Sequence, residues 1–306
     1  MNMLARAGPV LIDTIGTRMK FLPRRAPGAS LQISVIIGVK NGAATLQRCL
    51  DSVAVQDFAS RETIVIDSAS TDGTRELLEA NKRAGKAMDY VSEPDGGLYE
   101  AWNKGVLRSR GEWICFLGCD DAFHDPQALR YLAAAADAAR DATGMVYGLV
   151  NRVTHSGVVA EVWGGPWQEA KAGSFAGFMI PHPGSLHHRS IFEERGLFDE
   201  SYRIAGDYEL VLRELLVREP VFVDRVVVDM RFGGMSSRPA AIYKTLQEVQ
   251  RARAAHGLHG KPARLRQALA AAWIGSWIQR LFGDRTYRFF ADLYRVLRGK
   301  PRIWTA

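Results

Sequence analysis

Two adjacent carboxylates, Asp120 and Asp121, directly follow an apolar segment that runs from 113 to 117. A short apolar run of this kind is typical of a buried strand, whereas ionised carboxylates are costly to bury. The pair is therefore expected to emerge where the strand ends, at the carboxyl edge of a sheet. Hard oxygen ligands at such an edge suit Mg²⁺ or Mn²⁺, and either ion could hold a phosphate there.

A third carboxylate, Asp67, ends a second apolar strand, expected over 62–67, and should lie at the same edge. There it could accept a hydrogen bond from the imide N–H of uracil or from a ribose hydroxyl. The alternative is that Asp67 only begins the turn 68–73, and the residues leave both interpretations open. For Asp72, in the same turn, capping of the following helix is the favoured interpretation.

The turn 38–42 follows the first apolar strand and contains Lys40. It lacks the GxGxxG spacing of a dinucleotide site. Lys40 could still reach a phosphate, although a solvated lysine explains it equally simply.

Strands and helices alternate through the first part of the chain, which predicts parallel strands joined by right-handed crossovers in an α/β fold. We expect strands at 33–39, 62–67, 87–92 and 113–117, helices at 43–54 and 72–83, and a third helix before the turn at 110–111. Further along we expect a helix at 128–140, a hairpin of 145–153 with 157–163, a helix ending near 217 and a strand at 221–230.

Five segments carry a resemblance to a known family. They read SVIIGVKNGAATLQRCLDSVAVQ, ETIVIDSASTDGT, EPDGGLYEAWNKG, GEWICFLGCDD and FDESYRIAGDYELVLR, and they occur in this order over roughly residues 32–230. In these segments the chain resembles the inverting glycosyltransferases of family 2. The resemblance implies a GT-A fold, in which a Rossmann-like, mostly parallel sheet is flanked by helices, and a metal-dependent transfer of a sugar from a nucleotide donor.

The resemblance also implies a role for each matching carboxylate and amide. Asp67 would hold the nucleotide base, while Asp95 and Asn103 would lie near the nucleotide. Asp121 would be the direct ligand of Mn²⁺ or Mg²⁺, with Asp120 as a ribose contact or a second metal contact. Two residues depart from the family pattern: Cys119 precedes the acidic pair, and Trp102 stands where many members have an arginine.

Asp207 matches the catalytic base of such enzymes. Inversion needs a carboxylate that removes the acceptor hydroxyl's proton while that oxygen attacks the anomeric carbon from the face opposite the nucleotide. The alternative, a helix N-cap, is less favoured given the order of the motifs. His182, with His187 and His188, could form a metal cluster, but we expect these histidines to line the acceptor side, with His182 contacting the nucleotide sugar.

The net charge of +7 is unevenly distributed. Residues 31–250 carry 23 basic against 30 acidic side chains, residues 1–30 have a net charge of +4 and residues 251–306 of +10. An acidic core argues against a nucleic-acid partner, which favours a basic face on the folded domain. We therefore divide the chain into a basic extension (1–30), a catalytic domain (31–250) and a basic helical tail (251–306).

The tail has an apolar stripe every four residues, bordered by arginines, which is typical of a helix lying in a membrane interface. The stripe comprises Leu265, Leu269, Trp273, Trp277 and Leu281. Packing on the catalytic domain or on a second subunit is the alternative. No secretory signal is convincing and no apolar run reaches the roughly 20 residues of a spanning helix. The three cysteines suggest a reducing compartment.

These expectations combine into one interpretation. The protein would be a cytoplasmic glycosyltransferase, peripheral on the inner face of the cell membrane, that uses a UDP-sugar and a lipid-linked saccharide acceptor in cell-surface polysaccharide synthesis. A catalytically degenerate GT-A scaffold in an assembly complex is one alternative. A sugar-nucleotide pyrophosphorylase is another, although it would need a Gly-rich basic phosphate loop that 38–42 does not supply.

Overall fold

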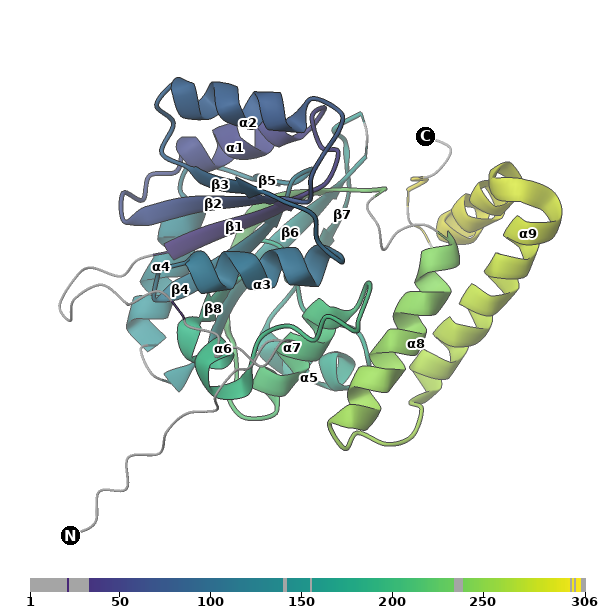
Figure 1. The fold of residues 1–306 in the computed structure, drawn as a ribbon. Coiled ribbons are helices and arrows are strands. Elements are labelled where there is room, and N and C mark those ends of the chain that lie inside the picture. Colours follow the sequence, from purple (N-terminus) through teal and green to yellow (C-terminus); the bar gives the residue numbers. More distant parts are fainter. Residues whose placement is uncertain are drawn as a thin grey trace, which may run out of the picture.

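The computed structural model describes residues 21, 33–139, 142–154, 156–233, 239–297, 299 and 301–303. Nine strands form one sheet in the order β3-β2-β1-β4-β8-β6-β9-β5, and β7 pairs with β6 outside this path. Helices cover both faces of this sheet, and two C-terminal helices stand beside it (Figure 1). The chain therefore has the α/β architecture that its alternating pattern predicts.

The first four strands form the parallel half of the sheet. They are β1 (Ile33–Val39), β2 (Arg61–Asp67), β3 (Asp89–Ser92) and β4 (Trp113–Gly118), and β1 lies between β2 and β4. Every residue of β1 is buried. A strand covered on both faces gains from being apolar throughout, which explains why its sequence shows no polar alternation.

One face of this half is covered by α1 (Leu46–Ala54), α2 (Thr74–Arg83) and α4 (Ala128–Ala139). The other face carries α3 (Leu98–Arg108), α6 (Arg189–Arg195) and α7 (Gly206–Leu215). Alternate residues of β1 belong to different hydrophobic cores, one on each face of the sheet. Val35 and Ile37 face the first group of helices, and Ile36 faces the second.

The remaining strands make the sheet mixed. The short β8 (Leu186–His188) runs antiparallel to both β4 and β6 (Met145–Val153), whereas β6 and β9 (Val221–Arg231) are parallel. The expected hairpin is confirmed, because β7 (Val159–Trp163) pairs antiparallel with β6. The two-residue β5 (Ala122–Phe123) pairs with β9, and α5 (Trp167–Phe175) packs near Tyr147 of β6.

The C-terminal region consists of α8 (Pro239–Ala255) and α9 (Ala263–Leu297). The expected domain boundary after residue 250 falls inside α8, whose Val249 and Ala252 are buried in the same core as α3 and α7. The first part of the tail's apolar stripe packs there too, because Leu265 is fully buried.

The helix α9 is not one continuous rod. Gly283 has a φ of 84° and a ψ of 170°, so the helix breaks there. A Cβ on Gly275 would lie 2.8 Å from the ring of Tyr287, so the segments before and after the break pack together (Figure 1). Large apolar side chains on both segments remain exposed, among them Trp273 at 52% and Leu281 at 66%.

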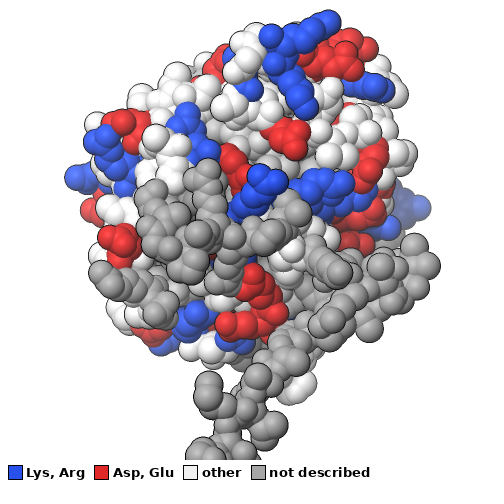
Figure 2. Space-filling view, turned by 60° about the vertical axis from the view of Figure 1, so that its left-hand side comes forward, with Lys and Arg blue, Asp and Glu red and all other residues white. Residues whose placement is uncertain are grey.

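Among the described residues, no helix combines the length and the hydropathy that a transmembrane span requires. The expected N-terminal extension lies outside the described residues apart from Phe21. On the face seen in Figure 2, acidic and basic side chains of the described residues are interspersed. The described residues on that face therefore form no continuous basic surface of the kind that nucleic acids favour.

Candidate active site

Asp67 ends β2 at the carboxyl edge of the parallel strands, and it is fully buried. The hydroxyls of Ser70 and Ser92 donate to its carboxylate at 2.5 and 2.6 Å. These bonds offset the cost of burying the carboxylate and fix its orientation. Asp67 thus both begins the following turn and stands at the edge where a ligand would bind, so the two interpretations of the sequence are compatible.

Asp95 lies one serine away from Asp67. The Ser68 hydroxyl donates to Asp95 Oδ2 at 2.5 Å, and Asp95 Oδ1 accepts the Gly97 N–H at 3.1 Å. The structure therefore brings Asp67 and Asp95 close together. Asp72 bonds to the start of α2, because its carboxylate accepts the N–H of Thr74 at 3.1 Å, but the N-cap residue of this helix is Gly73.

The pair Asp120 and Asp121 follows the end of β4. A Cβ on Gly118 would lie 2.7 Å from Asp121 Oδ2 and 3.0 Å from Asp120 Oδ1, so both carboxylates fold back over this glycine. Asp121 is 6% exposed, and its Oδ1 accepts the Arg231 N–H at 3.0 Å. Burial and the charge of Asp120 raise the pKa of Asp121.

The register of the strands relates these groups to one another. Val39 of β1 is paired with Asp67, and Gly38 is paired with Gly118. Because β2 and β4 flank β1, the strand ends that carry Asp67 and the acidic pair lie about 10 Å apart. Lys40, at the end of β1 between them, is exposed.

Two carboxylates converging over a glycine fit a divalent cation. Mg²⁺ and similar ions are commonly held by one or two carboxylates, with substrate phosphates completing the coordination. The described residues contain no group of three or more His, Cys, Asp or Glu side chains placed to hold a metal. The protein would thus supply Asp120 and Asp121, and the diphosphate of a substrate would supply further oxygens. Burial and the two neighbouring carboxylates raise the pKa of the Cys119 thiol to about 12.

Asp207 lies in the first turn of α7. Its Oδ1 accepts the Tyr208 N–H at 2.8 Å and faces the Tyr99 hydroxyl at 3.4 Å. Burial raises the pKa of Asp207 to about 6. A carboxylate with this pKa is ionised at neutral pH and is basic enough to take a proton. The N-cap alternative is not what the structure shows, because α7 begins after Ala205.

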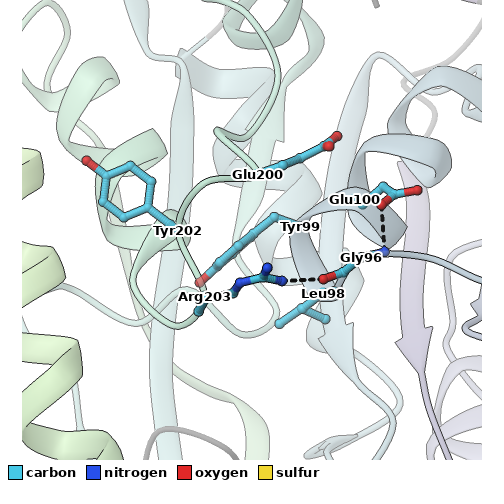
Figure 3. Close-up of a pocket in the computed structure, with 8 residues that line it drawn as sticks. Gly96, Leu98, Tyr99, Glu100, Glu200, Tyr202 and Arg203 are labelled. Carbon is cyan, nitrogen blue, oxygen red and sulfur yellow. Dashed lines mark hydrogen bonds between the residues drawn. The ribbon is translucent and has the colours of Figure 1, made fainter. Parts of the chain in front are cut away.

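A pocket is lined by residues 96–100, which follow Asp95, and by residues 200–203, which precede Asp207 (Figure 3). The pocket lies between the loop that leads into α3 and the loop that leads into α7. Tyr99, which is hydrogen-bonded to Asp207, forms part of its wall. Arg203 bridges the two loops by donating to the Gly96 carbonyl. The lining residues are Gly96, Gly97, Leu98, Tyr99, Glu100, Glu200, Tyr202 and Arg203.

Sequence reasoning missed these wall residues, although Tyr99, Tyr202 and Arg203 lie inside two of the five matching segments. The sequence signal that could have pointed to them is the presence of aromatic side chains, Tyr99 and Tyr202, close to the acidic residues of these segments. Their meeting depends on a contact between segments more than 100 residues apart, which no local pattern reports.

Asn103 is placed differently from the expectation. Its amide nitrogen donates to the Phe198 carbonyl at 3.0 Å and to Glu200 Oε1 at 2.8 Å, while its oxygen accepts the Phe198 N–H at 2.9 Å. The side chain is 4% exposed. Since both donors and the oxygen are used within the protein, Asn103 fastens α3 to the segment preceding Asp207, and nothing in these contacts supports its predicted role at the nucleotide.

His182 is also placed differently. It is 2% exposed and stacks on Phe116, with ring centroids 5.5 Å apart, rather than lining an open acceptor surface. Its other ring neighbours are Trp102 and His187. Burial lowers the pKa of His182 to about 3, so this ring is neutral at physiological pH. His188 instead caps α6 by accepting the Ser190 N–H.

Comparison with known proteins gives consistent results. Residues 34–194 match the family model described as glycosyl transferase family 2. A PGL/p-HBAD biosynthesis glycosyltransferase of Mycobacterium tuberculosis is 30% identical over 222 residues, which cover 68% of this chain and 80% of the relative.

Two solved structures share the fold. Residues 1–349 of S. aureus TarS in complex with UDP-GlcNAc give a TM-score of 0.59 at 19% identity, covering 79% of this chain and 72% of the TarS chain. The mannosyltransferase PcManGT from Pyrobaculum calidifontis, in complex with GDP-Man and Mn²⁺, gives a TM-score of 0.58 at 18% identity and covers 93% of this chain and 86% of its own. At these identities the similarity establishes the GT-A fold alone.

Proposed function

Because the chain belongs to glycosyl transferase family 2, we propose that it transfers a sugar from a UDP-linked donor to an acceptor hydroxyl with inversion at the anomeric carbon. The observation that carries this proposal is that carboxylates follow β2 and β4 at one edge of the sheet, while a further carboxylate, Asp207, contacts the wall of the neighbouring pocket. Asp67 ends β2 with Asp95 beside it, and the acidic pair follows β4. Asp207 faces the pocket wall at Tyr99.

Each carboxylate has a distinct task in this proposal. Asp67 accepts the imide N–H of uracil, which selects the base. Asp207 accepts the proton of the acceptor hydroxyl while that oxygen bonds to the anomeric carbon and the bond to the diphosphate breaks. Asp120 and Asp121 would hold Mn²⁺ or Mg²⁺, which when bound would supply charge stabilisation for the departing diphosphate.

A donor panel tests the reaction itself. We expect release of UDP from at least one UDP-sugar, in the presence of Mn²⁺ and an acceptor extract, and no comparable release of GDP from GDP-mannose. Asp207→Asn should reduce transfer by at least about 10²-fold, the lower end of what general-base catalysis contributes, and leave UDP binding nearly unchanged. If no donor releases its nucleotide, the degenerate-scaffold alternative is favoured. If Asp207→Asn retains full activity, another residue must act as the base.

The metal assignment has a test that does not depend on turnover. Binding of Mn²⁺ to the protein with UDP can be followed by electron paramagnetic resonance, since bound Mn²⁺ loses its free-ion signal. We expect Asp121→Asn to weaken this binding strongly because Asp121 is the buried member of the pair. Asp125→Asn, a nearby loop substitution, should leave it unchanged. Equal Mn²⁺ binding by Asp121→Asn and the unaltered protein would overturn the assignment.

We further propose that the acceptor is a lipid-linked saccharide and that the protein binds the inner face of the cell membrane. The support lies in α9, whose Trp273, Trp277 and Leu281 are 52%, 45% and 66% exposed. Trp side chains on an exposed apolar face with arginines around them are typical of an interfacial helix. An anionic surface would also complement the basic excess of this region.

A further inference from the structure

The helix α8 lies outside the residues that match the family model, yet it supplies a buried carboxylate next to the candidate active site. Glu248 is 8% exposed. Its Oε2 accepts the N–H groups of Ile204 and Ala205, each at 2.9 Å, and the Arg203 N–H lies 3.1 Å from both of its carboxylate oxygens. One side chain thus binds three consecutive backbone donors.

These three donors belong to the loop that leads directly into α7. The N-cap residue of α7 is Ala205, and no side-chain cap is bonded to this helix start. The three N–H groups that Glu248 binds immediately precede the first turn of this helix, and the acidic residues within that turn are Asp207 and Glu209. Glu248 therefore fixes the loop before α7 from a helix about 40 residues further along the chain.

The same loop is held from the opposite side by α3. The Tyr99 hydroxyl donates to the Ile204 carbonyl at 2.6 Å, and it also lies 3.4 Å from Asp207 Oδ1. The peptide groups around Ile204 are therefore fixed from both sides, by Tyr99 and by Glu248. Asp207 follows three residues later, in the first turn of the helix that this loop begins.

We propose that Glu248 is a positioning residue for Asp207, holding the Arg203–Ala205 loop so that the first turn of α7 presents the Asp207 carboxylate to the acceptor. The proposal rests on the proposed role of Asp207 as the base. It makes α8 part of the catalytic unit, so that the machinery for acceptor activation extends beyond α7 into the C-terminal region.

The electrostatic effect of Glu248 gives a second readout. Its negative charge adds to the burial that raises the pKa of Asp207, while hydrogen bonds from the Tyr208 N–H and the Tyr99 hydroxyl lower it. Tyr99 on α3 and Glu248 on α8 are the titratable groups that act on Asp207. A residue with a structural role alone would affect stability without moving the pH dependence of the reaction.

Two substitutions in the full-length protein separate the effect of the Glu248 charge from the effect of its side-chain length. Glu248→Gln keeps the shape but removes the charge and replaces one acceptor oxygen by an NH2 group, which donates and cannot accept, so that only one oxygen remains for the three N–H groups. Glu248→Asp keeps the charge but withdraws the carboxylate by one methylene. The control is Glu76→Gln, which removes a single carboxylate from the exposed face of α2.

For Glu248→Gln we expect kcat to fall by on the order of 10²-fold, as for a misplaced catalytic group, with the KM for the donor nearly unchanged. The acid limb of its kcat–pH profile should move to lower pH, since removing the charge lowers the pKa of Asp207. Glu248→Asp should lower kcat without moving that limb. The control should match the unaltered enzyme in both measurements.

Hydrogen–deuterium exchange provides a readout that needs no activity. We expect the amides of 203–205 to exchange at least tenfold faster in Glu248→Gln than in the unaltered protein, with the strands β1 and β4 still protected. Unchanged exchange together with an unchanged kcat would overturn the positioning role. Faster exchange with kcat and the pH profile unchanged would overturn it as well, because the loop would then not set the position of Asp207. If no donor is turned over by the unaltered protein, the role of Asp207 fails, whereas the exchange result still decides whether Glu248 holds the loop.

Discussion

Asp207 allows a prediction at the scale of a single residue. Its pKa is raised to about 6 by burial, and only the ionised form can accept a proton. We therefore expect kcat to be constant above about pH 7 and to fall roughly tenfold per pH unit below about pH 6. The measurement is kcat at saturating donor and acceptor from pH 5 to 8. A profile that stays flat down to pH 5 would show that Asp207 is not the base.

His182 gives a prediction about stability. Burial lowers its pKa to about 3, so the folded protein holds this ring neutral while the unfolded chain protonates it below about pH 6.5. Burying this ring in its neutral form therefore costs nothing above about pH 6.5, and it destabilises the folded state progressively as the pH falls from 6.5 toward 3, by up to about 1.4 kcal/mol per pH unit.

His182→Phe keeps the ring stacked on Phe116 and removes the titration. Between pH 7 and 5 we expect the unaltered protein to lose about 2 kcal/mol more unfolding free energy than this variant. Chemical denaturation at each pH measures the difference, and any fixed packing cost of the larger ring cancels because it is the same at every pH. Parallel pH dependence in the two proteins would contradict the buried neutral state of His182.

The contact between α3 and β1 leads to a prediction at the scale of an element. Gly105 lies against Ile36, and a Cβ there would be 2.4 Å from Ile36 Cγ2. Gly105→Ala should therefore destabilise the fold by about 1–3 kcal/mol despite the better helix propensity of alanine. Because α3 carries Tyr99 and Asn103, a displaced helix should also lower kcat.

A matched control is available in α5. Gly173 is likewise inside a helix, but a Cβ there would meet nothing closer than 3.9 Å. Gly173→Ala should be neutral or stabilise by up to about 1 kcal/mol. Thermal and urea unfolding of both variants would decide the matter, and equal effects of the two substitutions would mean that the close approach of α3 to β1 is unimportant.

The tail gives a prediction at the scale of the whole molecule. We expect the full-length protein to float with vesicles of phosphatidylcholine and phosphatidylglycerol, to float less with phosphatidylcholine alone, and to be released by high salt through screening. Trp273→Ala with Trp277→Ala should weaken binding by at least about tenfold, which corresponds to about 1.4 kcal/mol.

The control for this experiment is the pair Val55→Ala with Val217→Ala, which removes exposed apolar side chains of the catalytic domain, 61% and 57% exposed. Its flotation should equal that of the unaltered protein. If the Trp variant floats as well as the unaltered protein, the exposed face of α9 is not the membrane contact. A shift from dimer to monomer in the Trp variant would instead assign that face to a second subunit.

Local patterns in the sequence predicted much of the fold. Apolar runs located the four parallel strands to within about two residues, and the hairpin of β6 with β7 was correctly expected. The positions of Asp67 and of the acidic pair at one edge were predictable too, because parallel strands place their carboxyl ends together. The mixed half of the sheet was not, since β8 is only three residues long and is defined by its neighbours.

The sequence by itself determined the family, the alternation that makes the parallel half, and the carboxylates at its edge, because each depends on residues close together in the chain. Only the tertiary structure decided what Asn103, His182 and Glu248 contact. Asn103 fastens a segment 95 residues away, and Glu248 holds a loop about 40 residues before it. Such contacts depend on how the helices pack across the sheet, and periodicity along the chain carries no record of that packing.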